Sequence, residues 1–134
     1  MDYAVAKQAY TESSILTAPP ERLVVMLYDG AIRFLTQSAV AMRRGDREMF
    51  LARMRRAEAI IDELNYTLDM SQGEVAINLR SVYTFCKRHM RQALIRQDAE
   101  PLDQVIKLLA DLRQSWQALA SQGTPAERSA AAAG

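Results

Sequence analysis

The chain has 134 residues, and its 17 lysines and arginines nearly balance 16 acidic residues, which leaves a formal net charge of +1. A chain of this length can bury about two thirds of its unfolded surface in one domain, so it needs no metal ion or disulfide to fold. The near-neutral charge excludes a bulk attraction to nucleic acid or anionic lipid. The single cysteine, Cys86, excludes an internal disulfide, and no stretch approaches the roughly 18 consecutive apolar residues of a membrane span. The first ten residues lack the apolar core of a secretory signal, which predicts a cytoplasmic protein.

Glycine and proline are scarce, and they cluster at four breaks in the chain. Between the breaks, apolar residues recur at spacings of three and four, which is typical of one face of an amphipathic helix. Helices are predicted over residues 19–43, 46–70, 74–97 and 101–121, with a cap segment over 1–12 and a disordered tail over 122–134. Because the connections are short, consecutive helices should run antiparallel. The predicted fold is therefore all-α, an up-down four-helix bundle with a short N-terminal helical segment.

The first helix, "PPERLVVMLYDGAIRFL", is apolar nearly all round, so we expect it to be buried nearly all round. Gly30 lies in its middle, where glycine costs about 1 kcal/mol relative to alanine, and this indicates a close neighbour. In the segment before it, Tyr3, Ala6 and Tyr10 fall on one face. That segment is too short to be a stable isolated helix, so we expect it to cover apolar surface that the bundle leaves open.

The second and third helices each carry a single apolar seam, and the fourth carries two adjacent rows. The seams are Leu51, Met54, Ala57, Ile61, Leu64 and Leu68 in the second helix and Val75, Leu79, Val82, Cys86, Met90 and Ala93 in the third. The rows of the fourth are Leu102, Ile106, Leu109 and Trp116 beside Val105, Leu108, Leu112 and Leu119. The wider face of the fourth helix indicates an additional packing partner. Local caps are expected at Asp46, as an N-cap, and at Gly73, as a C-cap.

The residue inventory argues against catalysis and against a metal or cofactor. A di-iron bundle needs Glu-x-x-His pairs and a zinc site needs four ligands, but the chain has one histidine, His89, and one cysteine. We interpret His89 as a surface or boundary residue. No glycine-rich phosphate loop and no nucleophile with an evident general base is present.

Charge is unevenly distributed along the chain. Six arginines lie between residues 43 and 56, five acids and no base lie between 57 and 79, and five bases and no acid lie between 80 and 96. The hairpin of the second and third helices should therefore have an acidic tip and a basic opposite end. Such runs are either solvated surface or a means of orienting a partner, and the lack of interleaved exposed aromatic residues argues against nucleic acid.

Four stretches carry a family resemblance: "APPERLVVMLYDGAIRFL", "AEAIIDELNYTLD", "GEVAINLRSVYTFCKRHM" and "LLADLRQSW". In order and spacing they resemble the flagellin-specific export chaperones of the FliS family, from about Tyr10 to Trp116. The most distinctive residues are Pro20, Leu23, Tyr28, Asp29, Gly30, Ala31 and Ile32, followed by the landmarks Tyr83 and Trp116. The alanine-rich end after Gly123 has no role that the family explains.

The resemblance implies a cytoplasmic export chaperone without catalytic activity or cofactor. Such a chaperone binds the disordered C-terminal segment of flagellin, prevents its premature polymerisation and delivers it to the flagellar type III export apparatus. The implied partners are flagellin and the flagellar export gate, with a homodimer as a further possibility. From a different class, the alternative is a structural helical bundle that self-associates through its surplus apolar rows and has no flagellin client.

Site residues can be assigned on this basis. The flagellin-binding groove is expected at Ile60, Ile77, Tyr83, Leu108, Leu112 and Leu119, each of which has an alternative role in the core. Tyr3, Ala6 and Tyr10 are expected to cap the groove, or to contact the export gate, and to move when flagellin or the gate binds. Tyr28 and Gly30 are best explained by packing, and Asp29 and Arg33 lie one helical turn apart, where they could pair. A further expectation is that Tyr83→Asp or Leu112→Asp loses flagellin affinity but stays helical.

Overall fold

The structure, a computed structural model, describes residues 20–122, and they form helices connected by short turns. The elements are α2 (Pro20–Arg43), α3 (Arg47–Tyr66), the 3-10 helix η1 (Met70–Gln72), α4 (Glu74–Arg96) and α5 (Glu100–Ser121). Residues 20–122 contain no strand, so the predicted all-α class is confirmed. The predictions for Tyr3, Ala6, Tyr10 and the C-terminal tail lie outside the described residues.

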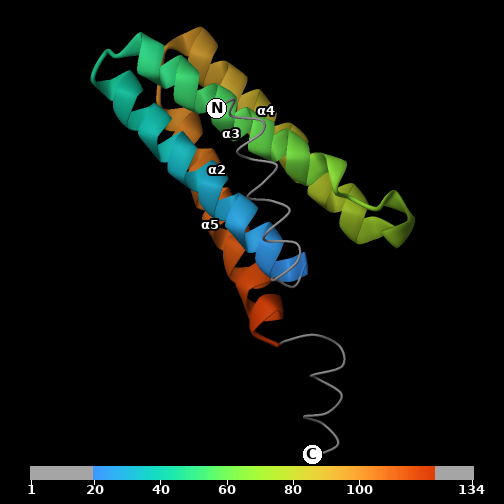
Figure 1. Ribbon diagram of the computed structural model, residues 1–134. Helices are drawn as coiled ribbons and strands as arrows, with labels where there is room; N and C mark the ends of the chain where they lie inside the picture. The colour runs from blue at the N-terminus through green and yellow to red at the C-terminus, as the bar shows by residue number, and fades with distance from the viewer. Residues whose placement is uncertain (1–19, 123–134) are drawn as a thin grey trace, which may run out of the picture.

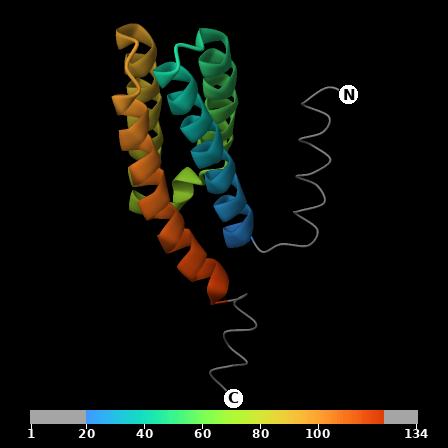
Figure 2. The same cartoon turned by 90° about the vertical axis from the view of Figure 1, so that its left-hand side faces the viewer.

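The four α-helices form an up-down bundle (Figures 1 and 2). Helix α2 packs against α3 and α5, and α4 packs against the same two helices, so α2 and α4 face each other diagonally. At one end the α2–α5 pair diverges from the α3–α4 pair (Figure 1). We call this the open end; it comprises the start of α2, the turn from α3 to α4 and the end of α5.

Helix α2 contributes one face to the core. By length and composition alone, Glu21–Arg43 could cross a membrane, which corrects the expectation that no stretch comes near a membrane span. However, Tyr28, Ala31 and Leu35 are fully buried in the core cluster that α2 shares with its neighbours. The rest of the helix is only partly covered, and Val40 is 41% exposed, so the expectation that it is buried nearly all round is wrong. We interpret α2 as a core helix of a soluble bundle that leaves some apolar surface open.

The connection from α3 to α4 is longer than expected, because α3 ends at Tyr66 rather than near residue 70. The Thr67 hydroxyl donates to the Leu64 carbonyl at 2.7 Å, and the Asp69 carboxylate accepts the backbone N–H of Ser71 at 3.0 Å. Threonine, aspartate and serine side chains compete in this way for the backbone groups that a helix would use. At the turn from α2 to α3, Asp46 is the expected N-cap, accepting the Met49 N–H at 3.0 Å.

Gly30 does have the close neighbour that its position indicated. A Cβ atom at Gly30 would lie 3.0 Å from Cδ1 of Ile60, on α3. Ile60 is itself buried, so little room remains for a larger residue at position 30. The absence of a side chain here allows α2 and α3 to approach closely.

The seam of α4 is rotated by one residue at its start relative to the prediction. Ala76 and Tyr83 are buried where Val75 and Val82 were expected, and Val75 is 66% exposed. Adjacent residues differ by about 100° around a helix, so two neighbouring rows fit the same periodicity. Only the position of the neighbouring helices distinguishes them.

Candidate functional site

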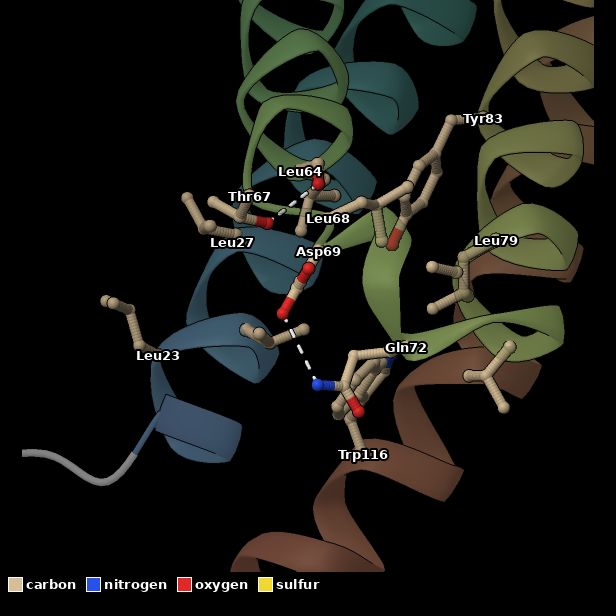
Figure 3. Close-up of a pocket in the computed structure, with 13 residues that line it drawn as sticks. Leu23, Leu27, Leu64, Thr67, Leu68, Asp69, Gln72, Leu79, Tyr83 and Trp116 are labelled. Carbon is tan, nitrogen blue, oxygen red and sulfur yellow. Dashed lines mark hydrogen bonds between the residues drawn. The ribbon is translucent and has the colours of Figure 1, made fainter.

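A pocket opens between the diverging helix pairs at the open end, with a volume of about 340 Å³. Figure 3 shows side chains from both helix pairs and from the turn between α3 and α4 converging on it. The lining residues are Leu23, Val24, Leu27, Leu64, Thr67, Leu68, Asp69, Gln72, Val75, Ala76, Leu79, Tyr83 and Trp116. Ten of these thirteen are apolar or aromatic. Pockets of this size with an apolar lining are typical binding sites for apolar groups.

The polar groups of the lining serve the turn rather than a ligand. The Asp69 carboxylate accepts hydrogen bonds from the Ser71 hydroxyl at 2.6 Å and from the Gln72 amide at 3.3 Å, and the latter bond is drawn in Figure 3. The Ser71 hydroxyl and N–H, followed by Gln72, lower the pKa of Asp69. Asp69 therefore stays ionised and places a negative charge at the rim.

Tyr83 lines the floor of the pocket, and a second buried tyrosine, Tyr28, lies against it. Tyr83 is 2% exposed, and its phenol oxygen lies 2.8 Å from that of Tyr28 in a shared hydrogen bond. The rings meet edge to face, with centroids 6.4 Å apart. Because this contact joins α2 to the diagonally opposite α4, it links the two sides of the bundle directly below the pocket. Burial raises the pKa of both phenols, so neither is suited to proton transfer near neutral pH.

Exposed apolar side chains gather around the same end. Of the nine large apolar residues that are exposed in the described part of the chain, five belong to the open end: Tyr66, Met70, Val75, Ile77 and Leu119. Clustered exposed apolar residues on a soluble protein indicate a surface that another molecule covers. We call these five exposed residues the rim. The pocket and the rim together form the candidate functional site.

The structure brings together some of the residues predicted for the groove and separates others. Tyr83 lies on the pocket floor, and Ile77 and Leu119 are exposed at the open end. Leu108 and Leu112 are half-buried on α5, outside the pocket lining, and Ile60 is buried against Gly30.

The sequence reasoning missed the contribution of the first turns of α2. Leu23, Val24 and Leu27 line the pocket. The signal was present, because the surplus apolar rows of this helix exceed what its neighbours can bury. Their meeting with Leu68 and Leu79 depends on how α2 and α4 are placed across the bundle.

Asp29 pairs across helices and not along α2. It forms an ion pair with Arg113 of α5, which corrects the suggested pairing with Arg33. The Arg33 guanidinium instead lies 5.1 Å from the centroid of the Phe34 ring. The Asp29 carboxylate raises the pKa of Arg113. Because both partners are partly exposed, this pair positions α2 against α5 more than it stabilises them.

The described residues contain no group of three histidine, cysteine or acidic side chains that could hold a metal ion. The His89 ring lies on Phe85, with centroids 3.9 Å apart. Its Nδ1 atom lies 3.2 Å from the Phe85 carbonyl oxygen.

Buried Cys86 makes the stability of the bundle sensitive to alkaline pH. Burial raises the pKa of its thiol to about 12. The unfolded chain releases this proton near pH 8.5. The contribution of the neutral thiol to stability is therefore complete below that pH and is lost as the pH rises toward the folded-state pKa.

We expect the free energy of unfolding to fall by about 2 kcal/mol between pH 8 and pH 10, measured by urea denaturation. In Cys86→Ala, whose side chain does not titrate, the decrease over the same range should be much smaller. An equal decrease in both proteins would contradict this assignment.

Comparison with known proteins identifies the family. The family model described as flagellar protein FliS matches residues 3–123. The chain belongs to the FliS family. It is 34% identical to the flagellar secretion chaperone FliS of Bacillus subtilis over 115 residues, which are 85% of this chain and 86% of that protein. It is 31% identical to the chaperone of the same name from Salmonella typhimurium over 119 residues, 87% of this chain and 88% of the relative.

A third relative covers more of the chain. The flagellar secretion chaperone FliS of Campylobacter jejuni is 30% identical over 128 residues, 95% of this chain and all of that protein. The resemblance read from the motifs is confirmed. As a member of the FliS family the protein is a flagellar export chaperone and not an enzyme. Its client is therefore a protein that is exported during flagellar assembly.

Proposed function

We propose that the open end binds the C-terminal segment of flagellin in the cytoplasm, keeps it from polymerising and releases it at the flagellar export gate. The observation that carries the proposal is the apolar pocket surrounded by five exposed apolar residues at one end of the bundle. An amphipathic helix that lays its apolar face into such a concave site is a common mode of peptide recognition.

The energetics favour an extended client contact. A disordered segment that folds on binding loses about 1 to 2 kcal/mol of conformational entropy per backbone residue. Apolar burial offsets this at about 25 cal/mol per Å². A client segment therefore needs more surface than the pocket alone, and we propose that it continues from Ile77 and Leu119 along α5 over Leu112 and Leu108. In this proposal Tyr83 forms the pocket floor. Ile60, which is buried against Gly30, supports the site through core packing and does not touch the client.

The N-terminal segment is proposed to cover the same site in the free chaperone. Tyr3, Ala6 and Tyr10 would occupy the pocket and leave it when flagellin or the export gate binds. Support comes from the start of α2, which lies at the open end with Leu23 in the pocket lining.

Trp116 offers a direct test, because it is the only tryptophan in the chain and it lines the pocket. A tryptophan-free C-terminal segment of flagellin should shift Trp116 fluorescence to shorter wavelength by burying the ring, whereas flagellin truncated at its C-terminus should not. Deletion of residues 1–12 should shift the emission of the free protein to longer wavelength. Tight binding with unchanged Trp116 emission would place the client elsewhere, and no binding at all would refute the proposal.

Self-association is a second candidate activity, because the exposed rim at Tyr66, Val75 and Ile77 could equally be buried against another copy. Molecular mass in solution at micromolar concentration, with and without the flagellin segment, separates the two. If the rim binds the client, the protein should be either a monomer with and without the segment or a dimer that the segment dissociates. A dimer that persists and excludes the segment would favour self-association.

A further inference from the structure

A second groove lies between α2 and α3, toward the turn that connects them. Its volume is about 350 Å³, and its lining residues are Thr36, Gln37, Val40, Ala41, Arg44, Asp46, Met49 and Arg53. It shares no residue with the open-end pocket. Because α2 and α3 lie side by side here, at the upper left of Figure 1, the groove runs along their shared edge. We call it the α2–α3 groove.

The centre of this groove is apolar and accessible. Val40 on α2 and Met49 on α3 are 41% and 40% exposed, although both lie beside the buried Ala41. Methionine is flexible and polarisable, so it adapts to different apolar partners. The two exposed side chains give the groove an apolar floor that water covers in the free protein.

Arginines flank the floor from both helices. On α2, Arg33, Val40 and Arg44 follow one another at spacings of seven and four residues, which places them along one face. On α3, Met49 and Arg53 lie one turn apart, and the Arg53 Nε atom lies 3.2 Å from the Met49 sulfur.

The cationic border continues beyond the lining. Arg33 and Arg56 both lie over the Phe34 ring, at 5.1 and 5.6 Å from its centroid. Asp46 is the acid in the lining, and its carboxylate is engaged as the N-cap of α3. Glu48 lies beside Met49 in an adjoining hollow, so the cationic part of the border is formed by Arg44 on α2 and by Arg53, one turn further along α3.

We propose that the α2–α3 groove docks an acidic amphipathic helix of a partner protein, at a site separate from the cargo site. Apolar side chains of that helix, spaced at three and four residues, would lie on Val40 and Met49, and its glutamates or aspartates would pair with Arg44 and Arg53. Arg33 and Arg44 lie eleven positions apart on α2, or about 16 Å along its axis, which matches a partner helix of about three turns. Nucleic acid fits less well, because the lining has no exposed aromatic side chain for stacking.

The probe is an 18-residue peptide, acetylated and amidated, with leucine on one helical stripe and glutamate at the flanking positions. The comparison peptide carries lysine in place of every glutamate. By fluorescence anisotropy, the glutamate peptide should bind at least tenfold more tightly than the lysine peptide, and the difference should shrink at high salt. Arg44→Glu and Arg53→Glu should each weaken the glutamate peptide at least tenfold. Arg88→Glu, a charge reversal at an exposed residue of α4, is the matched control and should leave it unchanged.

Several results would overturn the proposal. Equal binding of the two peptides would overturn it. So would wild-type affinity for the glutamate peptide in both Arg44→Glu and Arg53→Glu, once circular dichroism shows that these variants are folded. If a single-stranded oligonucleotide of about 20 bases competes more strongly than the peptide, the groove is a nucleic-acid site. If the protein is a dimer that Val40→Asp makes monomeric, its occupant is a second copy. The Trp116 response to the flagellin segment should persist in all these variants, so that failure here is distinct from failure of the cargo site.

Discussion

Val75→Asp is expected to weaken binding of the flagellin C-terminal segment about 100-fold, which corresponds to about 2.7 kcal/mol. Val75 lines the open-end pocket and is 66% exposed in the free protein, so a carboxylate there is solvated and the fold is preserved. When an apolar client covers the rim, that carboxylate loses its water without gaining a partner. Asp69 lines the same pocket and is ionised, so its carboxylate would repel the new one at position 75, and this repulsion grows when the client excludes water. Isothermal titration calorimetry with the flagellin segment measures the loss.

The matched control for this substitution is Ile95→Asp. Ile95 is also β-branched, lies on the same helix and is 73% exposed, but it belongs to the last turn of α4, away from the open end. It should retain affinity within a factor of about three. Equal losses in the two variants would show that charge on α4, and not coverage of the rim, governs binding.

Tyr83→Asp is expected to unfold the bundle or destabilise it by about 5 kcal/mol, which is a large part of the stability of a small domain. This replaces the expectation that the variant stays helical and loses only flagellin affinity. Tyr83 is 2% exposed, so the substitution would bury a carboxylate in an apolar core and remove the hydroxyl that shares a hydrogen bond with Tyr28. Far-ultraviolet circular dichroism during urea denaturation measures the effect.

Tyr83→Phe separates the hydrogen bond from the packing. It keeps the ring and should cost about 1 kcal/mol, because the buried Tyr28 hydroxyl loses one of its two side-chain hydrogen-bond partners and keeps the other, Trp116. In the Tyr28→Phe background the same change should cost clearly less. A Tyr83→Asp protein with wild-type helicity and urea midpoint would contradict the buried position of this side chain.

Charge patterning is an intermediate case between local and tertiary information. The arginine-rich stretch from 43 to 56 was evident in the sequence, but whether it was solvated surface or a partner surface was left open. The fold places Arg44 and Arg53 on two helices beside Val40 and Met49. Charge becomes informative about a partner only when such an apolar floor lies beside it.

The sequence by itself determined the features that depend on neighbouring residues. Helical periodicity, the cap at Asp46 and the family motif around Tyr28 are each encoded within a few residues, so they could be read directly. Gly30 indicated a close neighbour, but only the fold shows that this neighbour is Ile60. The same local rules placed the end of α3 four residues too late. Side-chain hydrogen bonds such as that of Thr67 decide where a helix stops, and periodicity does not record them.

Only the tertiary structure decided which residues meet. Asp29 pairs with Arg113, 84 residues away, and Val75 rather than Ala76 faces outward at the rim. The pocket exists because the α2–α5 pair diverges from the α3–α4 pair at the open end (Figure 1). A rotation of about 100° interchanges adjacent rows of a helix without altering its apolar period, so the periodicity is compatible with either arrangement. The choice is made by packing against helices that are distant in the sequence.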